Sequence, residues 1–336
     1  MDFGKKARKH QELFKLSSDT FSENSKISND GKGQRNGHLL KIGCEMENLY
    51  PTLRFDAVRY FNQRSIPWWQ SERSGDDMNE NHPTRNLASS QVACVNFLMF
   101  LADKVDLLTR ILKTIDNDIT SISEIKYINP ATKMEIYSNI EFEWIGLNKL
   151  LEMGAPYTRG QNVTNIDAFI IGNYPMGKRA YLFEWKYVEF YSEKDYKGFG
   201  KSGDIRRKRY SDMFASEKSP FVKGTNLEDF LYEPFYQIMR LFLLGNRMVQ
   251  YQELGVNDFR VVVVVPKSNI KYRNTITSKP IKVNFQLVTI EDAIKYYLKN
   301  NNAFRIISQN FLLENIISFT DSEWLNYMKE RYFDDL

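Results

Sequence analysis

The chain has 336 residues, of which 42% are apolar and 26% charged, and its formal net charge is +4. Such a chain is long enough to bury one large core or two modest ones, and its composition is typical of globular proteins. No stretch is apolar and long enough to cross a bilayer or to form a signal-peptide core. The only cysteines, Cys44 and Cys94, exclude a disulfide scaffold and share no ligand spacing with a histidine, which argues against a structural zinc site. We therefore expect a cytoplasmic protein.

The first 86 residues carry few signals of a core. Residues 1–40 combine a short basic stretch of helical character with a segment rich in Ser, Asn and Gly, so we expect a flexible N-terminal segment. Residues 41–86 contain one short predicted helix, Phe55–Gln63, and then irregular polar sequence. We interpret residues 41–86 as an N-terminal extension that is available for contact with DNA.

From Ser90 the pattern becomes that of a buried helix. Val92 and Val95 recur at helical spacing, and apolar residues fill the other sides. Ser89 or Ser90 is a suitable N-cap. Asn96 is polar within this apolar helix and therefore requires a hydrogen-bonding partner.

Three strands are predicted next, at Ile140–Ile145, Asp167–Ile171 and Ala180–Val188. Gly172–Gly177 is typical of a hairpin connection, so the second and third strands should pair antiparallel. The later predicted elements are a helix at Leu227–Glu253, a buried strand at Arg260–Val265, a strand near Phe285–Val288, and helices at Ile290–Leu298 and Ser322–Tyr332. The order helix, three strands, helix, strand predicts an α/β fold with a mixed central sheet flanked by helices.

Glu184 and Lys186 form the most informative pair in the sequence. Alternate residues of a strand share a face, so both side chains should point to the same side as Leu182. The strand is largely apolar, and burying a carboxylate and an ammonium group there costs several kcal/mol unless each finds a partner. A routine ion pair on a solvated strand is the common explanation for an isolated Glu-x-Lys.

Asp167 changes this interpretation, because it begins the neighbouring strand of the predicted hairpin. An acid there can face the acid at Glu184, and two adjacent carboxylates repel each other. A divalent cation such as magnesium removes that repulsion, which makes Asp167 and Glu184 candidate metal ligands. Lys186 can orient or deprotonate a water molecule, or stabilise charge on a phosphate. The three residues therefore suit the hydrolysis of a phosphodiester.

An acid at the start of a strand, followed by an apolar residue and Glu-x-Lys, resembles the PD-(D/E)xK nuclease superfamily, typical of restriction endonucleases. The motif stands here as Asn165-Ile166-Asp167 and Phe183-Glu184-Trp185-Lys186, with Ile166 at the position of the usual proline. Two further segments, Ser89–Phe97 and Glu184–Glu189, are similar to bacterial type II restriction endonucleases. The resemblance covers the predicted core from about residue 87 to 266.

The resemblance implies a restriction-endonuclease-like core within a nuclease domain of residues 87–300, followed by a C-terminal helical extension at 301–336. It implies a Mg²⁺-dependent endonuclease, able to use Mn²⁺, that cleaves double-stranded DNA as a sequence-specific type II enzyme beside a cognate methyltransferase. A homodimer with two-fold symmetry would suit palindromic sites. Two further catalytic residues are implied: the acid Glu143, and the polar Gln237 on the helix that follows.

Two segments are candidates for contact with DNA. The predicted loop after the catalytic strand could bind phosphates through a cluster of cations: Lys194, Lys197, Lys201, Arg206, Arg207, Lys208 and Arg209. A second loop could place Arg159 on a phosphate and Gln161 and Asn162 on base edges. The resemblance adds Gln91. Ordinary surface loops and turn chemistry are the alternative explanation for both segments.

Other functions remain open at this stage. The nearest is a nicking, repair or mobile-element nuclease with the same fold. A catalytically inactive DNA-binding protein would be expected to lose one of the three motif residues, and all three are intact. A glycosidase with paired carboxylates would leave the basic cluster without a purpose. The sequence contains no Gly-rich nucleotide-binding loop with its lysine, so we expect no ATP-driven module in this chain.

Overall fold

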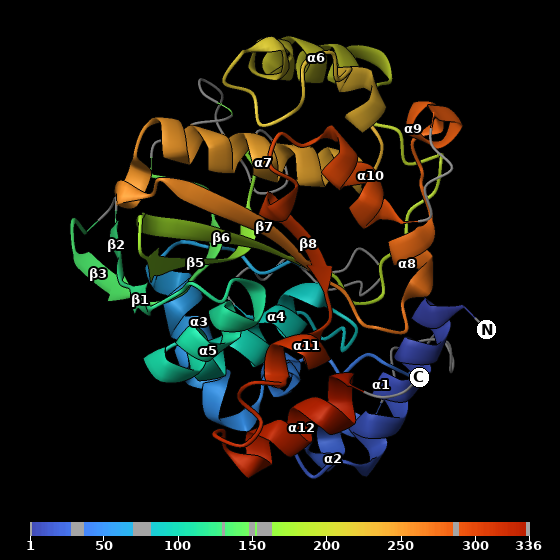
Figure 1. The fold of residues 1–336 in the computed structure, drawn as a ribbon. Helices are drawn as coiled ribbons and strands as arrows, with labels where there is room; N and C mark the ends of the chain where they lie inside the picture. The colour runs from blue at the N-terminus through green and yellow to red at the C-terminus, as the bar shows by residue number, and fades with distance from the viewer. Residues whose placement is uncertain are drawn as a thin grey trace.

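A six-stranded mixed sheet forms the centre of the protein (Figure 1). The structure, a computed structural model, describes residues 2–27, 37–69, 82–129, 132–147, 152, 163–284 and 289–333. The strand order is β1-β5-β6-β7-β8, and β4 also pairs with β5. The strands of this sheet are β1 (Ser121–Ser123), β4 (Glu141–Trp144), β5 (Ile166–Tyr174), β6 (Gly177–Trp185), β7 (Asp258–Val264) and β8 (Phe304–Ile307). A separate antiparallel pair joins β2 (Ile125–Ile128) and β3 (Glu135–Ser138).

The predicted hairpin is confirmed as β5 and β6, which pair antiparallel along most of their length. Its turn is tighter than the predicted one, because β5 continues to Tyr174 and β6 begins at Gly177. Gly177 has a φ of +138°, and a Cβ at this position would lie 2.5 Å from the side chain of Asn257, so glycine is required there. β7 then pairs parallel with β6, and β8 with β7.

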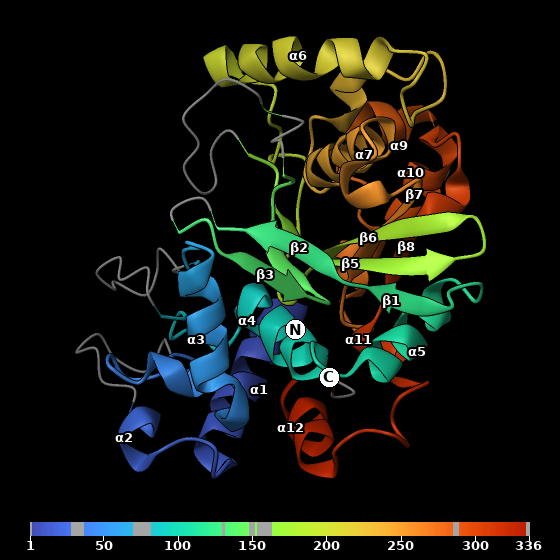
Figure 2. The same ribbon diagram turned by 90° about the vertical axis from the view of Figure 1, so that its left-hand side faces the viewer.

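Helices cover both faces of the sheet and form two cores (Figures 1 and 2). Side chains alternate between these cores, since Ile170 and Phe183 point into the first and Phe169 and Leu182 into the second. The first core contains residues of α1 (Phe3–Ser17), α3 (Arg54–Gln63), α4 (Ser90–Leu98), α5 (Val105–Ile115), α11 (Gln309–Leu313) and α12 (Ser322–Tyr332). The second contains residues of α6 (Gly200–Ala215), α7 (Phe235–Gln250), α8 (Ile270–Asn274), α9 (Lys279–Asn284) and α10 (Ile290–Tyr297). The short helix α2 is Glu23–Lys26.

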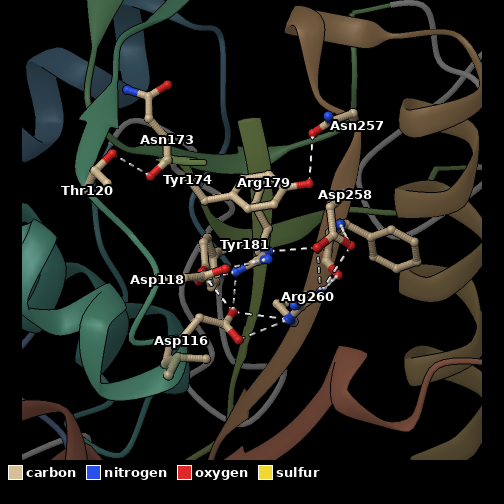
Figure 3. A network of polar contacts seen from close by, with 12 residues as sticks. Asp116, Asp118, Thr120, Asn173, Tyr174, Arg179, Tyr181, Asn257, Asp258 and Arg260 are labelled. Atoms are coloured by element: carbon tan, nitrogen blue, oxygen red, sulfur yellow. Dashed lines mark hydrogen bonds and ion pairs between the residues drawn. The ribbon is translucent and has the colours of Figure 1, made fainter. Parts of the chain in front are cut away.

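A network of charged side chains ties the sheet together near the start of β6 and β7 (Figure 3). Arg179 lies between two carboxylates, at 2.7 Å from both Asp118 and Asp258. Arg260 of β7 bonds to Asp116 at 3.0 Å and to Asp258 at 3.0 Å. Burying these arginines is tolerable because carboxylates surround them. The network fixes the chain after α5 against the sheet.

The helical character expected at the start of the chain is confirmed, but this part of residues 1–40 is packed and not a flexible segment. Phe3–Ser17 forms helix α1, which packs beside α12 and brings the two ends of the chain together (Figure 1). Gln11 is buried and its amide nitrogen donates to the carbonyl of Arg331 at 2.7 Å. The guanidinium of Arg331 is itself fully buried and donates to Gln11 and to oxygens of Asn48. The buried face of α1 carries apolar residues and the amide of Gln11, which explains this packing. The many basic residues of the helix make that face difficult to recognise in the sequence.

The predicted C-terminal extension also differs, because Phe304–Ile307 is strand β8 of the central sheet. The predicted helix at Leu227–Glu253 is interrupted, since Pro234 lacks a backbone N–H and α7 begins only after it. The predicted strand near Phe285–Val288 lies outside the described residues. The other late elements are confirmed, with α12 matching Ser322–Tyr332.

The N-terminal extension is held to the sheet by a buried ion pair between α3 and β4. Arg64 follows α3 and donates through Nε and Nη2 to the two carboxylate oxygens of Glu141, each at 2.7 Å. The two side chains are only 4% and 1% exposed. This bidentate geometry is the arrangement in which a buried ion pair is best compensated.

Replacing Arg64 with methionine should strongly destabilise the protein, because it leaves the Glu141 carboxylate buried without its cation. We expect a loss of about 3–5 kcal/mol in the free energy of unfolding. Arg59→Met is a matched control on the same helix, since the Arg59–Asp56 pair is 69% and 59% exposed. It should change stability by less than about 0.5 kcal/mol. Urea unfolding of both variants measures the difference, and equal losses would contradict this account.

Candidate active site

A pocket of about 320 Å³ lies between the sheet and α7. All five candidate catalytic residues line it: Glu143, Asp167, Glu184, Lys186 and Gln237. The rest of its lining is Trp69, Ser89, Ser90, Gln91, Val163, Thr164, Asn165, Arg240 and Leu241. The structure therefore brings the five candidates together, although Glu143 and Gln237 are 94 residues apart in the sequence.

The pairing of the strands places three carboxylates side by side. β5 pairs with β6 through Ala168↔Phe183, so Asp167 stands opposite Glu184 one residue further along. On its other side β5 pairs with β4 at the residues before and after Glu143, which puts Glu143 opposite Asp167. The three acids belong to adjacent strands and all line the same pocket.

Asp167 carries the electrostatic cost of this arrangement. Burial, followed by the nearby Glu184 and Glu143 carboxylates, raises the pKa of Asp167 well above its usual range. Two interactions oppose this shift: the nearby charge of Lys186, and the backbone N–H of Trp185, which donates to Asp167 Oδ2 at 2.7 Å. A cation beside Asp167 would remove the repulsion that its carboxylate meets.

Lys186 is held by Glu184, with Nζ 2.5 Å from Oε1, and both side chains are 7% exposed. Burial alone lowers the pKa of Lys186, but the Glu184 carboxylate and more distant groups outweigh it and raise the pKa well above its ordinary value. Lys186 lines the pocket, where its Nζ could orient or deprotonate a water molecule or stabilise a phosphate.

Glu143 reaches the pocket through an unusual backbone conformation, with a φ of +50°. This conformation breaks the alternation of β4, so that Phe142 points into the first core and Trp144 into the second. The carboxylate of Glu143 accepts hydrogen bonds from Gln91 at 2.6 Å and from Asn165 at 3.0 Å. Left-handed backbone at a residue other than glycine is costly and is concentrated at functional sites.

Gln91 begins α4 and has both ends of its amide engaged within the protein. Its nitrogen donates to Glu143, and its oxygen accepts from the backbone N–H of Trp69 at 3.0 Å. Gln91 is also buried. Gln91 lines the pocket and positions Glu143, and its predicted contact with DNA stays a prediction. Asn96 has the partners that its place in an apolar helix requires, in Asn48, Tyr50 and Tyr332.

Comparison with protein families gives a match to the family described as "Restriction Endonuclease associating with ARP", over residues 15–333. The chain belongs to this family. No curated protein and no solved structure matches it. The predicted resemblance to restriction endonucleases is confirmed, and so is the restriction-endonuclease-like α/β fold with its mixed sheet. Membership of this restriction endonuclease family makes the protein a nuclease that acts on DNA.

The predicted basic loop of this restriction endonuclease is wrong from Gly200 onward, because residues 200–215 form helix α6. Several of its cationic side chains also have partners within the protein, which is not expected of a solvated loop. Arg207 pairs with Glu228 at 2.5 Å, Arg206 donates to the carbonyl of Lys197 at 2.7 Å, and Lys197 lies 3.7 Å from Glu233. Lys194, Lys201 and Lys208 are exposed, and Arg209 is half-buried.

The second predicted DNA-contacting segment, with Arg159, Gln161 and Asn162, lies outside the described residues. The described residues beside it reach the site, since Val163 and Thr164 line the pocket. Glu152 accepts from the backbone N–H of Thr164 at 2.9 Å and from its hydroxyl at 2.5 Å. Glu152 also accepts from Tyr210 of α6 at 2.9 Å, so this restriction endonuclease anchors α6 close to the pocket.

Sequence reasoning missed Arg240, which lines the pocket from α7. Its only signal is its spacing, because it lies one helical turn after Gln237 and residues three apart share a helix face. Gln237 itself accepts a hydrogen bond from Tyr191 at 3.3 Å. Among the described residues, no helix is long and apolar enough to cross a membrane.

The oxygen donors of the pocket fit a hard divalent cation. Asp167 and Glu184 are adjacent and repel each other, and the side-chain oxygen of Asn165 is buried without a hydrogen-bond partner among the described residues. No group of three His, Cys, Asp or Glu side chains in the described ranges is arranged to enclose a cation by itself.

Replacing Asp167 with asparagine should stabilise the metal-free protein by about 1 kcal/mol, as is common when a strained active site is relieved. The neutral amide removes the repulsion with Glu143 and Glu184, and its oxygen still accepts from the Trp185 N–H. Thermal unfolding in a chelating buffer measures the effect. Asp118→Asn serves as a control and should destabilise, because Arg179 lowers the pKa of Asp118. A less stable Asp167→Asn variant would show that the three carboxylates do not repel.

Proposed function

We propose that this restriction endonuclease is a Mg²⁺-dependent enzyme of the PD-(D/E)xK type that hydrolyses phosphodiester bonds in double-stranded DNA. One observation carries the proposal: Asp167, Glu184 and Lys186 lie in one pocket, on adjacent strands, beside the further acid Glu143. Asp167 and Glu184 would hold the Mg²⁺, and Mn²⁺, which takes similar oxygen ligands, should substitute. We place its activity in the cytoplasm.

The reaction requires a water oxygen to bond to phosphorus while the bond from phosphorus to one sugar oxygen breaks. The attacking water loses a proton, and the released sugar oxygen gains one. Bound Mg²⁺ supplies a Lewis acid and lowers the pKa of a coordinated water. Lys186, held in place by Glu184, donates hydrogen bonds to the attacking water or to a phosphate oxygen. Gln91 and Asn165 keep Glu143 in position beside Asp167.

Sequence-specific cleavage of the type II kind, beside a cognate methyltransferase, is the form of this activity that we propose. The match to a restriction endonuclease family supports it, and so does the absence of a nucleotide-binding loop from the sequence. A homodimer would match the symmetry of a palindromic site. A nicking, repair or mobile-element nuclease with the same pocket is the second candidate.

Incubation of the purified protein with long mixed-sequence DNA and Mg²⁺ tests the proposal. We expect discrete fragments, and no cleavage by Asp167→Asn, Glu184→Gln or Lys186→Ala or in the presence of a chelator. Mg²⁺ should raise the melting temperature of the wild type but not of Asp167→Asn. A smear of fragments would indicate a nonspecific nuclease, and nicked circles a nicking enzyme. Binding of DNA without any cleavage would overturn the enzymatic proposal.

The exposed lysines of α6, together with Lys194, remain our candidates for phosphate contacts. Lys201→Glu/Lys208→Glu should weaken DNA binding by roughly tenfold or more at low salt, and should reduce the slope of log affinity against log salt by about 2. The control is Lys113→Glu/Lys329→Glu, which makes the same charge change at exposed positions on the opposite layer. Equal losses in both double variants would show a general charge effect and no local contact.

A further inference from the structure

Arg240 places a guanidinium group in the pocket from the side opposite the strands. It belongs to α7, whereas Glu143, Asp167 and Glu184 come from β4, β5 and β6. The pocket thus has an acidic wall formed by the sheet and a cationic group on the helix. Neither the family match nor the PD-(D/E)xK motif assigns a role to this arginine.

The polar contacts of Arg240 are few. Its Nη1 donates to the carbonyl of Val163 at 3.4 Å, and its guanidinium carbon lies 5.0 Å from the ring centre of Tyr236. Its Nε is buried and has no hydrogen-bond partner in the part of the chain that the structure describes. Within that same part, no carboxylate lies within ion-pair distance of it. An arginine offers five N–H donors, so most of the binding capacity of Arg240 is unused.

Two buried arginines of this protein have carboxylate partners. Arg64 donates to both oxygens of Glu141, and Arg179 lies between Asp118 and Asp258. Arg240 is half-buried, and the carboxylates of Glu152 and Glu233 act on it only from beyond ion-pair distance. Its buried Nε has no acceptor among the described residues, and leaving such a donor without a partner is costly. An anion that enters the pocket would supply that partner.

The ammonium group of Lys186 is not fully available to bind a phosphate, because it is already paired with Glu184 at 2.5 Å. A phosphodiester that approaches Glu143, Asp167 and Glu184 would meet three acids, the proposed Mg²⁺ between two of them, and one lysine that is already paired. A positive group on the helix side of the pocket would add to the charge of that Mg²⁺. A guanidinium suits this role, because its fork of N–H groups can bind two oxygens of one phosphate.

We propose that Arg240 is a catalytic residue that binds the non-bridging oxygens of the scissile phosphate through Nε and a terminal nitrogen. It would neutralise the charge that gathers on these oxygens while the water oxygen bonds to phosphorus and the bond to the leaving sugar oxygen breaks. Tyr236 supports the guanidinium through its ring. This inference rests on the proposed nuclease function and adds a substrate-binding group to it.

Cleavage by Arg240→Ala, Arg240→Lys and a control measures this role. Arg240→Ala should cleave DNA roughly 100- to 1,000-fold more slowly than the wild type, as when one charge-stabilising donor is removed from an active site. Arg240→Lys should be intermediate, because an ammonium keeps the charge and loses the fork. Added guanidinium ions should restore part of the activity of Arg240→Ala and none of that of Lys186→Ala. Arg247→Ala, on the same helix but outside the pocket lining, should cleave normally.

A binding measurement separates this inference from the proposed function. In the Asp167→Asn background, which binds without cleaving, Arg240→Ala should reduce the slope of log affinity against log salt by about 0.9, the value for one phosphate contact. If the wild type cleaves no DNA, the nuclease proposal fails while this slope still tests the phosphate contact. Wild-type cleavage by Arg240→Ala would overturn the inference. So would slow cleavage with an unchanged slope, a lowered melting temperature and no rescue, which would make Arg240 structural.

Discussion

Repulsion among Glu143, Asp167 and Glu184 is the constraint around which this structure is organised. The three carboxylates lie on adjacent strands, with Glu143 and Glu184 buried and Asp167 half-buried, so that like charges interact more strongly than in bulk water. Each has a specific donor that partly offsets the repulsion: an amide from α4 for Glu143, a backbone N–H for Asp167, and the ammonium of Lys186 for Glu184. Stability is given up here for function, since acids that would be more stable apart are held where a cation and a phosphate can meet.

The surrounding elements serve to hold these donors in place. Gln91 stands at the start of α4, and the position of α4 is fixed from the other side of the core by α12. Trp324 donates from its ring nitrogen to the carbonyl of Asn96 at 3.0 Å, and the Asn96 amide donates to Tyr332 at 3.0 Å. The C-terminal helix therefore lies far from the pocket in sequence and still determines where Gln91 points.

The parts of the site that depend on strand alternation and one short hairpin were predictable from the sequence. Period two put Glu184 and Lys186 on one face, and the hairpin put Asp167 opposite them. The conformation of Glu143 was not predictable, because no local signal announces a left-handed residue that is not glycine. Arg240 was missed because the sequence does not show which arginines have a carboxylate partner in the folded protein. Strand β8 was missed because three apolar residues in a run of four are also compatible with a buried helix. The helical character of the first residues was expected, but the packing of α1 was missed because its buried face is short and basic residues dominate its composition.

The docking of α1 against α12 has a consequence for how the protein folds. During translation α1 leaves the ribosome long before α12, so it must wait for the surface on which it packs. Arg331 binds buried oxygens of Gln11 and Asn48, which are likewise made much earlier. A fragment that lacks α12 also lacks the support of α4. The contacts that hold Gln91 in the pocket are therefore complete only after α12 has been made.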